Sequence, residues 1–226
     1  MTPELEVLPD DVAAAERGAE VVADRADRAV RGRGRADLAL SGGRTPAKMF
    51  AILADRDLPW PRINLWQVDE RVAPANSQDR NLTHLQAALG GRVDAVVHPM
   101  PVDDADLQAA AARYAASLPP AFDLVHLGLG SDGHTASLVP GDPVLDVADR
   151  DVALTGVYRG HRRMTLTYRG ISRAGELLWL VTGTDKREAL AKLLAADPSI
   201  PAGRVAAARS TILLDRAALP NDAHAR

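Results

Sequence analysis

The sequence predicts an α/β fold with a largely parallel sheet flanked by helices, in a single domain that spans residues 1–226. Short apolar runs alternate with longer helical patterns through most of the chain, as in proteins built from βα units. Polar, glycine-containing loops follow several of the apolar runs, and such loops form ligand sites at the end of parallel strands. The length favours one domain over two, because domains commonly have about 100 to 200 residues.

The predicted elements follow in order along the chain. Segments with the short, apolar composition of strands are residues 5–8, 38–40, 63–68, 95–98, 124–129, 152–157, 164–167, 177–181 and 212–214. Helical patterns lie between most of them, at residues 11–31, 46–55, 82–89, 104–118 and 185–195. The segments 11–31 and 104–118 are rich in alanine, a strong helix former, with charges interspersed.

Composition excludes several classes of function. Lys and Arg number 27 against 30 Asp and Glu, so no general positive field favours nucleic acid. The chain has no cysteine, which rules out disulfides, thiolate metal sites and a cysteine nucleophile. The N-terminal MTPELEVLPDD lacks the pattern of a signal peptide, and no run of about 18 apolar residues is present to span a bilayer. We therefore expect a cytoplasmic protein with no nucleic-acid or membrane partner.

The most informative segment is residues 122–141, FDLVHLGLGSDGHTASLVPG. An apolar strand runs here into a glycine-rich loop, in which Gly128, Gly130 and Gly133 permit backbone conformations that a Cβ would forbid. The loop delivers His134 to the carboxyl end of the strand, the edge at which open α/β sheets bind ligands. An imidazole titrates near neutral pH, so His134 is a candidate general base that takes a proton from water.

Two other interpretations of this segment are open on these residues alone. A histidine in a loop often does no more than hydrogen-bond the backbone. The three glycines also fit G-x-G-x-x-G, the fingerprint of dinucleotide-binding folds. That fingerprint belongs to a complete βαβ unit with an acidic residue about 20 positions on, whereas residues 140–143 here are turn-forming. The sequence therefore disfavours a dinucleotide site.

A second loop, LALSGGRTP at residues 38–46, has the features of a phosphate cradle. A buried strand leads to Gly42 and Gly43, and Thr45 is predicted to cap a helix whose first turn begins at Pro46. Free amides at a helix start favour an anion, and glycines let the backbone approach it closely. An ordinary strand-to-helix turn uses the same residue types, so the motif alone does not decide between the two.

Charged residues follow another predicted strand, in INLWQVDER at residues 63–71. Arg71 suits phosphate because its planar donors stay charged and bind oxygens in pairs. The carboxylates of Asp69 and Glu70 are candidates to orient water or an imidazole. A surface ion-pair cluster is the alternative. The next loop ends at Asn81, which is a candidate cap for the helix of residues 82–89.

Two segments nearer the C-terminus add candidates. LLWLVTGTDK, residues 177–186, repeats the arrangement of strand, glycine and polar turn, and Lys186 either grips phosphate or remains a solvated surface residue. In RMTLT, Arg163, Thr165 and Thr167 alternate onto one face of a strand, which lines either a polar pocket or solvent. The basic RGRGR of residues 31–35 is better explained as a solvated connection.

Taken together and in this order, SGGRTP, DER, GLGSDGHTASLVPG, RRMTLT and TGTDK resemble the glucosamine-6-phosphate isomerase/6-phosphogluconolactonase family, and its 6-phosphogluconolactonases in particular. The resemblance covers nearly the whole chain, and GLGSDGHTASLVPG is its most specific element. It implies a Rossmann-like fold similar to that of glucosamine-6-phosphate deaminase and ribose-5-phosphate isomerase. It also implies hydrolysis of 6-phospho-D-glucono-1,5-lactone to 6-phosphogluconate, a carboxylic ester hydrolysis of the pentose phosphate pathway, without metal or cofactor.

The resemblance assigns roles to individual positions. His134 is expected as the base and Asp69 as the acidic residue near it, while Arg71 and Lys186 are expected to hold phosphate. Further substrate or phosphate contacts are expected from residues of the glycine turn and from two other positions: Ser41, Gly42, Gly43, Arg44, Thr45, Gly130 and Arg163.

The chain departs from the family pattern at two of its loops. Arg44 stands where the family usually has a serine before the threonine, which removes one hydroxyl contact. Arg80 stands where a small polar residue usually precedes the asparagine. Both arginines would add positive charge near the site.

The implied mechanism needs no covalent intermediate, because a lactone is an activated ester that water attacks with modest help. The chain lacks the G-x-S-x-G and H-E-x-x-H patterns of serine and zinc hydrolases. One alternative is an isomerase or deaminase acting on glucosamine 6-phosphate, in which Asp69 would be the principal base and His134 would assist ring opening. A non-catalytic sugar-phosphate sensor is the other. We expect a sugar-phosphate lactone as the small-molecule partner, and a monomer.

Overall fold

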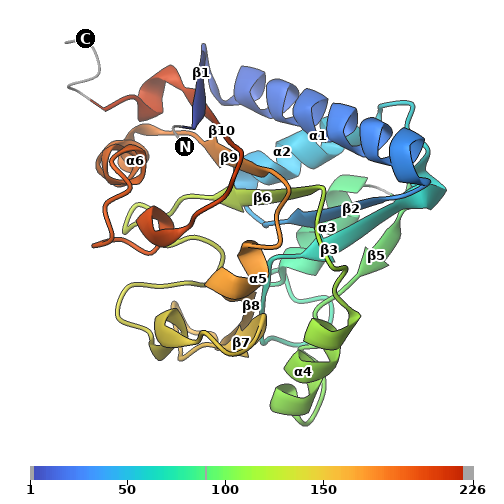
Figure 1. Cartoon of the computed structure of the whole chain (residues 1–226), viewed down its shortest axis with the longest axis vertical. Coiled ribbons are helices and arrows are strands. Elements are labelled where there is room, and N and C mark those ends of the chain that lie inside the picture. Colours follow the sequence, from blue (N-terminus) through green and yellow to red (C-terminus); the bar gives the residue numbers. More distant parts are fainter. Residues whose placement is uncertain (1–2, 90, 221–226) are drawn as a thin grey trace.

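The structure, a computed structural model, describes residues 3–89 and 91–220 and confirms the α/β fold (Figure 1). A seven-stranded sheet forms its centre, in the order β1-β10-β9-β6-β2-β3-β5, and every neighbouring pair is parallel. Its strands are β1 (Glu4–Leu8), β2 (Ala36–Leu40), β3 (Ile63–Gln67), β5 (Val96–His98), β6 (Leu124–Gly128), β9 (Leu177–Val181) and β10 (Ser210–Asp215). Each lies in or beside a segment that the sequence predicts as a strand.

A second, antiparallel sheet packs beside the first and has the order β4-β8-β7. Its strands are β4 (Asp69–Arg71), β7 (Val152–Leu154) and β8 (Arg163–Leu166). The DER tripeptide, expected as a loop, is strand β4, because Asp69 and Arg71 pair with Thr165 and Arg163 of β8. The strand expected at residues 152–157 ends at Leu154.

Helices cover both faces of the large sheet. They are α1 (Asp11–Arg33), α2 (Arg44–Ala54), α3 (Asn81–Leu89), α4 (Leu107–Ser117), α5 (Tyr168–Ile171) and α6 (Arg187–Leu194). The Asp10 carboxylate caps α1 by accepting from the amides of Val12 and Ala13, and Gly34 ends this helix with φ of 83°. Asp106 caps α4, so this helix begins three residues after the predicted start at residue 104.

Two hydrophobic cores lie on opposite faces of the sheet, which explains why apolar residues predominate in its central strands. Leu38 and Leu40 of β2 pack into the core formed with α1, α2 and α3, whereas Ala39 belongs to the core formed with α4, α5 and α6. Figure 1 shows α1 and α2 on one side of β2 and β6, with α5, β7 and β8 on the other.

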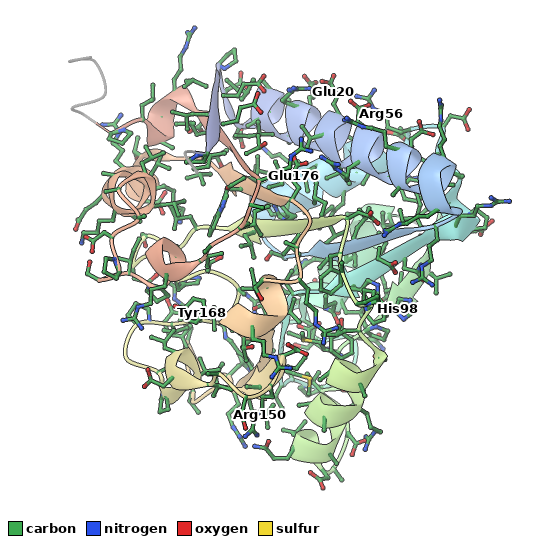
Figure 2. The ribbon with its side chains drawn as sticks, viewed as in Figure 1. Glu20, Arg56, His98, Arg150, Tyr168 and Glu176 are labelled. Carbon is green, nitrogen blue, oxygen red and sulfur yellow. The ribbon has the colours of Figure 1, made fainter. Side chains whose placement is uncertain are left out.

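Helices α1 and α2 on the first face are also joined at their surface. Glu20 of α1 and Arg56, just beyond α2, form an exposed ion pair at 3.8 Å, and both side chains are labelled in Figure 2. Exposed pairs of this kind contribute little to stability, so apolar burial between the helices dominates. Among the described residues, every helix is too short or too polar to cross a lipid bilayer.

Candidate functional site

Loops from four adjacent strands of the large sheet meet at one edge. The neighbours β9, β6, β2 and β3 are parallel, so their carboxyl ends point the same way and the chain leaves each of them at this edge. The loops that follow line a cleft with a volume of about 850 Å³. The size is that of a small-molecule site.

The cleft contains the side chains or backbone of every residue predicted for the site, apart from Arg44. They are Ser41, Gly42, Gly43, Thr45, Asp69, Arg71, Gly130, His134, Arg163 and Lys186. Arg44 is the first residue of α2, and its side chain lies outside what the structure describes. The structure therefore brings together residues that are far apart in the sequence, although their roles in binding and catalysis stay predictions.

His134 is held by Asp132, two residues earlier in the same loop. Its Nδ1 lies 2.5 Å from Asp132 Oδ1, and its backbone amide donates to the same oxygen at 3.2 Å. A carboxylate on Nδ1 fixes the tautomer that carries hydrogen there, so Nε2 is the nitrogen left to accept a proton. Asp132 was not among the predicted site residues, although it lies in the same GSDGH segment as His134.

The carboxylate of Asp132 is strongly acidic in this setting. Burial works to raise its pKa, but the neighbouring His134 and hydrogen bonds from Tyr158 and His134 outweigh burial and lower the pKa to about 2. Tyr158 Oη donates to Asp132 Oδ2 at 2.8 Å. Asp132 is therefore a carboxylate at any physiological pH and can orient His134.

Two glycines of this loop are required by its geometry. A Cβ on Gly130 would lie inside 3.0 Å of the imidazole of His134 and of the Asp132 carboxylate, so only glycine leaves room for this pair. Gly133 has φ of 82°, and a Cβ there would meet Ile200. No helix begins after Gly133 within the described residues up to 142, which removes the basis for a dinucleotide fingerprint.

Asp69 is buried in the wall of the cleft with both carboxylate oxygens occupied. Asn81 Nδ2 donates to Oδ1 at 3.1 Å, and Ser137 Oγ donates to Oδ2 at 2.6 Å. Asn81 in turn lies against the glycine turn, since a Cβ on Gly42 would fall inside 3.0 Å of its side-chain oxygen. The arrangement locks the carboxylate in one orientation.

The helix after this loop starts differently from the prediction. Asn81 is the first residue of α3 and does not cap it. The buried Glu70 accepts hydrogen bonds from the amides of Asn81 and Leu82, at 2.7 and 2.8 Å, and takes the place of a cap. Arg80 pairs with Asp103 and with Glu70, is 3 % exposed and does not line the cleft, so it supplies no positive charge there.

The glycine turn after β2 presents a helix start with no side-chain cap. Gly43, with φ of 139°, occupies the cap position, so the prediction that Thr45 caps the helix is wrong. The Thr45 hydroxyl pairs instead with that of Thr182 at 2.7 Å. The buried Ser41 hydroxyl has no hydrogen-bond partner. Uncapped amides and a free hydroxyl beside a cleft suit an anionic ligand.

Cationic side chains reach the cleft from several elements, among them Lys48 of α2. Arg71 of β4 and Arg163 of β8 each have a buried Nε without a hydrogen-bond partner. Arg163 is 5 % exposed, which shows that its strand face lines a polar pocket and not solvent. Lys186 ends a short 3-10 turn directly before α6. Arg159 also lines the cleft, although it was not predicted as a site residue. Several donors thus surround one cleft, which suits a phosphorylated ligand.

Among the described residues, no group of three or more His, Asp or Glu side chains is arranged to hold a metal ion. The site consists instead of an oriented imidazole, a fixed carboxylate, and arginine and lysine donors around a helix start.

The profile of the family described as glucosamine-6-phosphate isomerases/6-phosphogluconolactonase matches residues 9–214. The chain belongs to this family. A 6-phosphogluconolactonase from Synechocystis sp. is 38% identical over 213 residues, and the alignment covers 88% of each chain. The structure also resembles that of 6-phosphogluconolactonase from Thermotoga maritima, with a TM-score of 0.85, 27% identity, and coverage of 94% of this chain and 99% of the other.

The fold is also shared with a protein of different activity. A monomeric glucosamine-6-phosphate deaminase of the NagB superfamily has a TM-score of 0.85 at 19% identity, with 95% of this chain and 98% of the other covered. The comparison confirms the predicted likeness to deaminases in fold. The reaction depends on the residues of the cleft, because one fold can carry several activities.

Proposed function

We propose that this chain hydrolyses 6-phospho-D-glucono-1,5-lactone to 6-phosphogluconate, the reaction implied by the names of its relatives. The observation that carries the proposal is the Asp132–His134 pair, placed in the same cleft as an uncapped helix start and several cationic side chains. The pair supplies a base for water, and the helix start and cations supply a place for phosphate.

In the proposed mechanism, His134 acts as the general base. Its Nε2 takes a proton from water as the oxygen of that water forms a bond to the lactone carbonyl carbon. The bond from this carbon to the ring oxygen then breaks, and the proton passes from His134 to the departing oxygen. Asp132 keeps hydrogen on Nδ1 throughout and stabilises the transient positive charge on the ring.

Binding of the phosphate positions the carbonyl for this attack. Lys186 and the turn at Ser41, Gly42 and Gly43 would hold the phosphate, with arginines of the small sheet nearby. Such remote binding energy is used to orient the reacting carbon, and well-oriented groups gain large effective concentrations.

Asp69 supports the lactonase over the deaminase reaction. A deaminase would use Asp69 as the principal base at carbon 2 of the sugar, which requires this carboxylate to take up a proton. Here its two carboxylate oxygens are engaged by Asn81 and Ser137, and the residue is 5 % exposed. We infer that Asp69 acts through its fixed charge, by orienting cleft groups such as Arg163.

We also propose that the enzyme acts as a monomer, since the residues proposed for catalysis and for phosphate binding already meet within a single copy of the chain. Size-exclusion chromatography with light scattering would test this. A mass twice 24.0 kDa, with activity that falls on dilution, would contradict it.

The decisive experiment measures hydrolysis of freshly generated 6-phosphogluconolactone, coupled to 6-phosphogluconate dehydrogenase, against the spontaneous rate. We expect strong acceleration by the wild type, and a loss of about 10² to 10⁴ in kcat for His134→Ala with little change in KM. His84→Ala is the matched control, because this exposed histidine lies on α3 outside the cleft. No acceleration by the wild type would overturn the proposal, and deamination of glucosamine 6-phosphate would be measured next.

A further inference from the structure

A tight turn between β7 and β8 forms part of the rim of the cleft. The backbone amide of Tyr158 donates to the carbonyl of His161 at 2.9 Å, and His161 returns a bond at 3.3 Å. The two residues between them, Arg159 and Gly160, have φ of 49° and 85°. Two consecutive positive φ values are typical of a two-residue hairpin turn with defined geometry. The turn therefore fixes where Tyr158 points.

The hydroxyl of Tyr158 reaches across 26 residues of sequence to the loop that carries His134. It donates to Asp132 Oδ2 at 2.8 Å, while Asp132 Oδ1 bonds His134 Nδ1 at 2.5 Å. The Tyr158 ring also meets the His134 ring edge to face, with 5.5 Å between centroids. Tyr158 thus contacts both members of the Asp132–His134 pair.

The Tyr158 ring is itself held in place by two arginines. The guanidinium of Arg163 lies 5.0 Å from the ring centroid, and that of Arg159 lies 5.1 Å from it. Both distances are within the range of cation–π contacts. Burial and the hydrogen bond to Asp132 raise the pKa of Tyr158, so its hydroxyl remains a donor at physiological pH.

The Asp132 carboxylate needs a second hydrogen-bond partner because it is partly exposed to solvent. Its side chain is 36% exposed, so a carboxylate bonded on one oxygen alone could rotate toward water. The bond from Tyr158 occupies the second oxygen and prevents that rotation. Without it, the imidazole of His134 would lose the fixed orientation that the bond from Nδ1 to Asp132 gives it.

We propose that Tyr158 is a positioning residue for the reaction, which acts through Asp132 to hold His134 in the orientation of a general base. The inference rests on the proposed function for its catalytic consequence. Its structural content, a hydroxyl that immobilises the Asp132–His134 pair, stands on the contacts alone. A direct contact between Tyr158 and substrate, or a role confined to the stability of the hairpin, are the alternatives that an experiment must separate.

A double-mutant cycle separates them. Tyr158→Phe removes only the hydroxyl, and we expect kcat to fall about tenfold with KM within about twofold, because a hydrogen bond to a charged group is lost. In an Asp132→Asn background the same change should cost less than about twofold, since the residue through which Tyr158 acts is altered. Equal losses in the two backgrounds, or a higher KM at unchanged kcat, would overturn the proposal.

Tyr168→Phe is the matched control. This substitution also removes a single hydroxyl hydrogen bond, the one that Tyr168 donates to the carbonyl of Pro201 at 3.0 Å. Tyr168 lies on α5 outside the cleft (Figure 2). We expect its kcat to match that of the wild type. Thermal unfolding of each variant tests for loss of the fold, and equal losses of activity in Tyr158→Phe and Tyr168→Phe would count against a specific role.

A spectroscopic measurement keeps the inference testable even if the lactonase assay fails. The chain has six histidines, and ¹⁵N-histidine labelling with His134→Gln assigns the signal of His134. We expect a hydrogen-bonded Nδ1–H signal of one tautomer in the wild type, and exchange broadening or mixed tautomers in Tyr158→Phe. Identical spectra would overturn the proposal, whereas absent lactonase activity with altered spectra would contradict only the proposed function.

Discussion

Ser137 donates a hydrogen bond to Asp69 at 2.6 Å and joins two segments that are 68 residues apart in the sequence. Ser137 follows the loop that carries His134, and Asp69 begins β4 of the small sheet. The bond therefore ties the base-bearing loop to the wall of the cleft. Arg163 Nη1 reaches the same hydroxyl at 3.4 Å, so one buried serine connects a carboxylate and a guanidinium.

This relationship predicts a stability cost for Ser137→Ala. The variant leaves a buried carboxylate oxygen short of a partner, and we expect the free energy of unfolding to fall by about 1.5 to 3 kcal/mol. Urea denaturation measures the change. Ser172→Ala is the control, since the hydroxyl of this exposed serine donates to the carbonyl of Arg169 and to no buried charge, and its effect should stay within about 0.5 kcal/mol. Equal effects for the two variants would show that the bond to Asp69 adds nothing.

Removal of the Lys186 ammonium should weaken substrate binding more than turnover. Lys186 lines the cleft, and loss of a charged hydrogen bond of about 1.5 to 3 kcal/mol corresponds to a rise in KM of roughly 10- to 150-fold. The measurement is KM of Lys186→Ala in the coupled lactonase assay. Lys192→Ala, which removes a lysine of α6 paired with Glu188, should leave KM unchanged.

Unphosphorylated glucono-1,5-lactone provides the second half of this experiment. Its hydrolysis should be slow with the wild type and nearly as slow with Lys186→Ala, because this substrate has no phosphate for Lys186 to bind. If Lys186→Ala slowed the hydrolysis of both lactones to a similar extent, Lys186 would act in catalysis or in the structure of the cleft and not in phosphate binding.

Much of the site could be predicted because its residues follow strands. Four strand-and-loop segments carry Ser41, Asp69, His134 and Lys186, and parallel strands bring their carboxyl ends to the same edge. The alternation of Arg163 with two threonines likewise predicted a polar face, although it could not say which side of the strand met the cleft. Local sequence patterns were sufficient for these residues, because the residues that follow parallel strands lie close together at one edge of the sheet.

Other parts could not be predicted because they depend on contacts between distant segments. Nothing in the local sequence indicates that Glu70 caps α3, or that Arg80 turns away from the cleft to pair with Asp103. Tyr158 meets Asp132 only because the hairpin between β7 and β8 folds over the histidine loop. The cap predicted at Thr45 failed for the same reason, since its hydroxyl finds Thr182, 137 residues away.

Substitution of Gly130 by alanine should damage catalysis more than folding. The added Cβ would lie inside 3.0 Å of the His134 imidazole and of Asp132, so the pair must shift from its position. Misplacement by about 1 Å can reduce turnover by roughly 10²-fold. We expect a loss of that order in kcat for Gly130→Ala, with a far-UV circular dichroism spectrum like that of the wild type. Gly32→Ala is the control, since no atom lies within 4 Å of the added Cβ in α1.

The fully buried His126 should make the protein less stable as the pH falls from neutral. Burial lowers its pKa from 6.5 to about 4, so between these values the unfolded chain takes up a proton that the folded chain does not. Stability is therefore complete above the unfolded pKa and is lost progressively as the pH falls toward 4. The total loss amounts to about 3 kcal/mol from this one residue.

His126→Gln removes the titrating group, so its free energy of unfolding should depend less steeply on pH between 6.5 and 4 than that of the wild type. Urea denaturation at several pH values gives the two slopes. Phe50→Leu is the matched control, because the Phe50 ring packs against the His126 ring, with 6.1 Å between their centroids, but carries no charge. It should lower stability by a similar amount at every pH and leave the slope of the wild type intact. Parallel curves for wild type and His126→Gln would mean that His126 does not remain neutral in the folded protein.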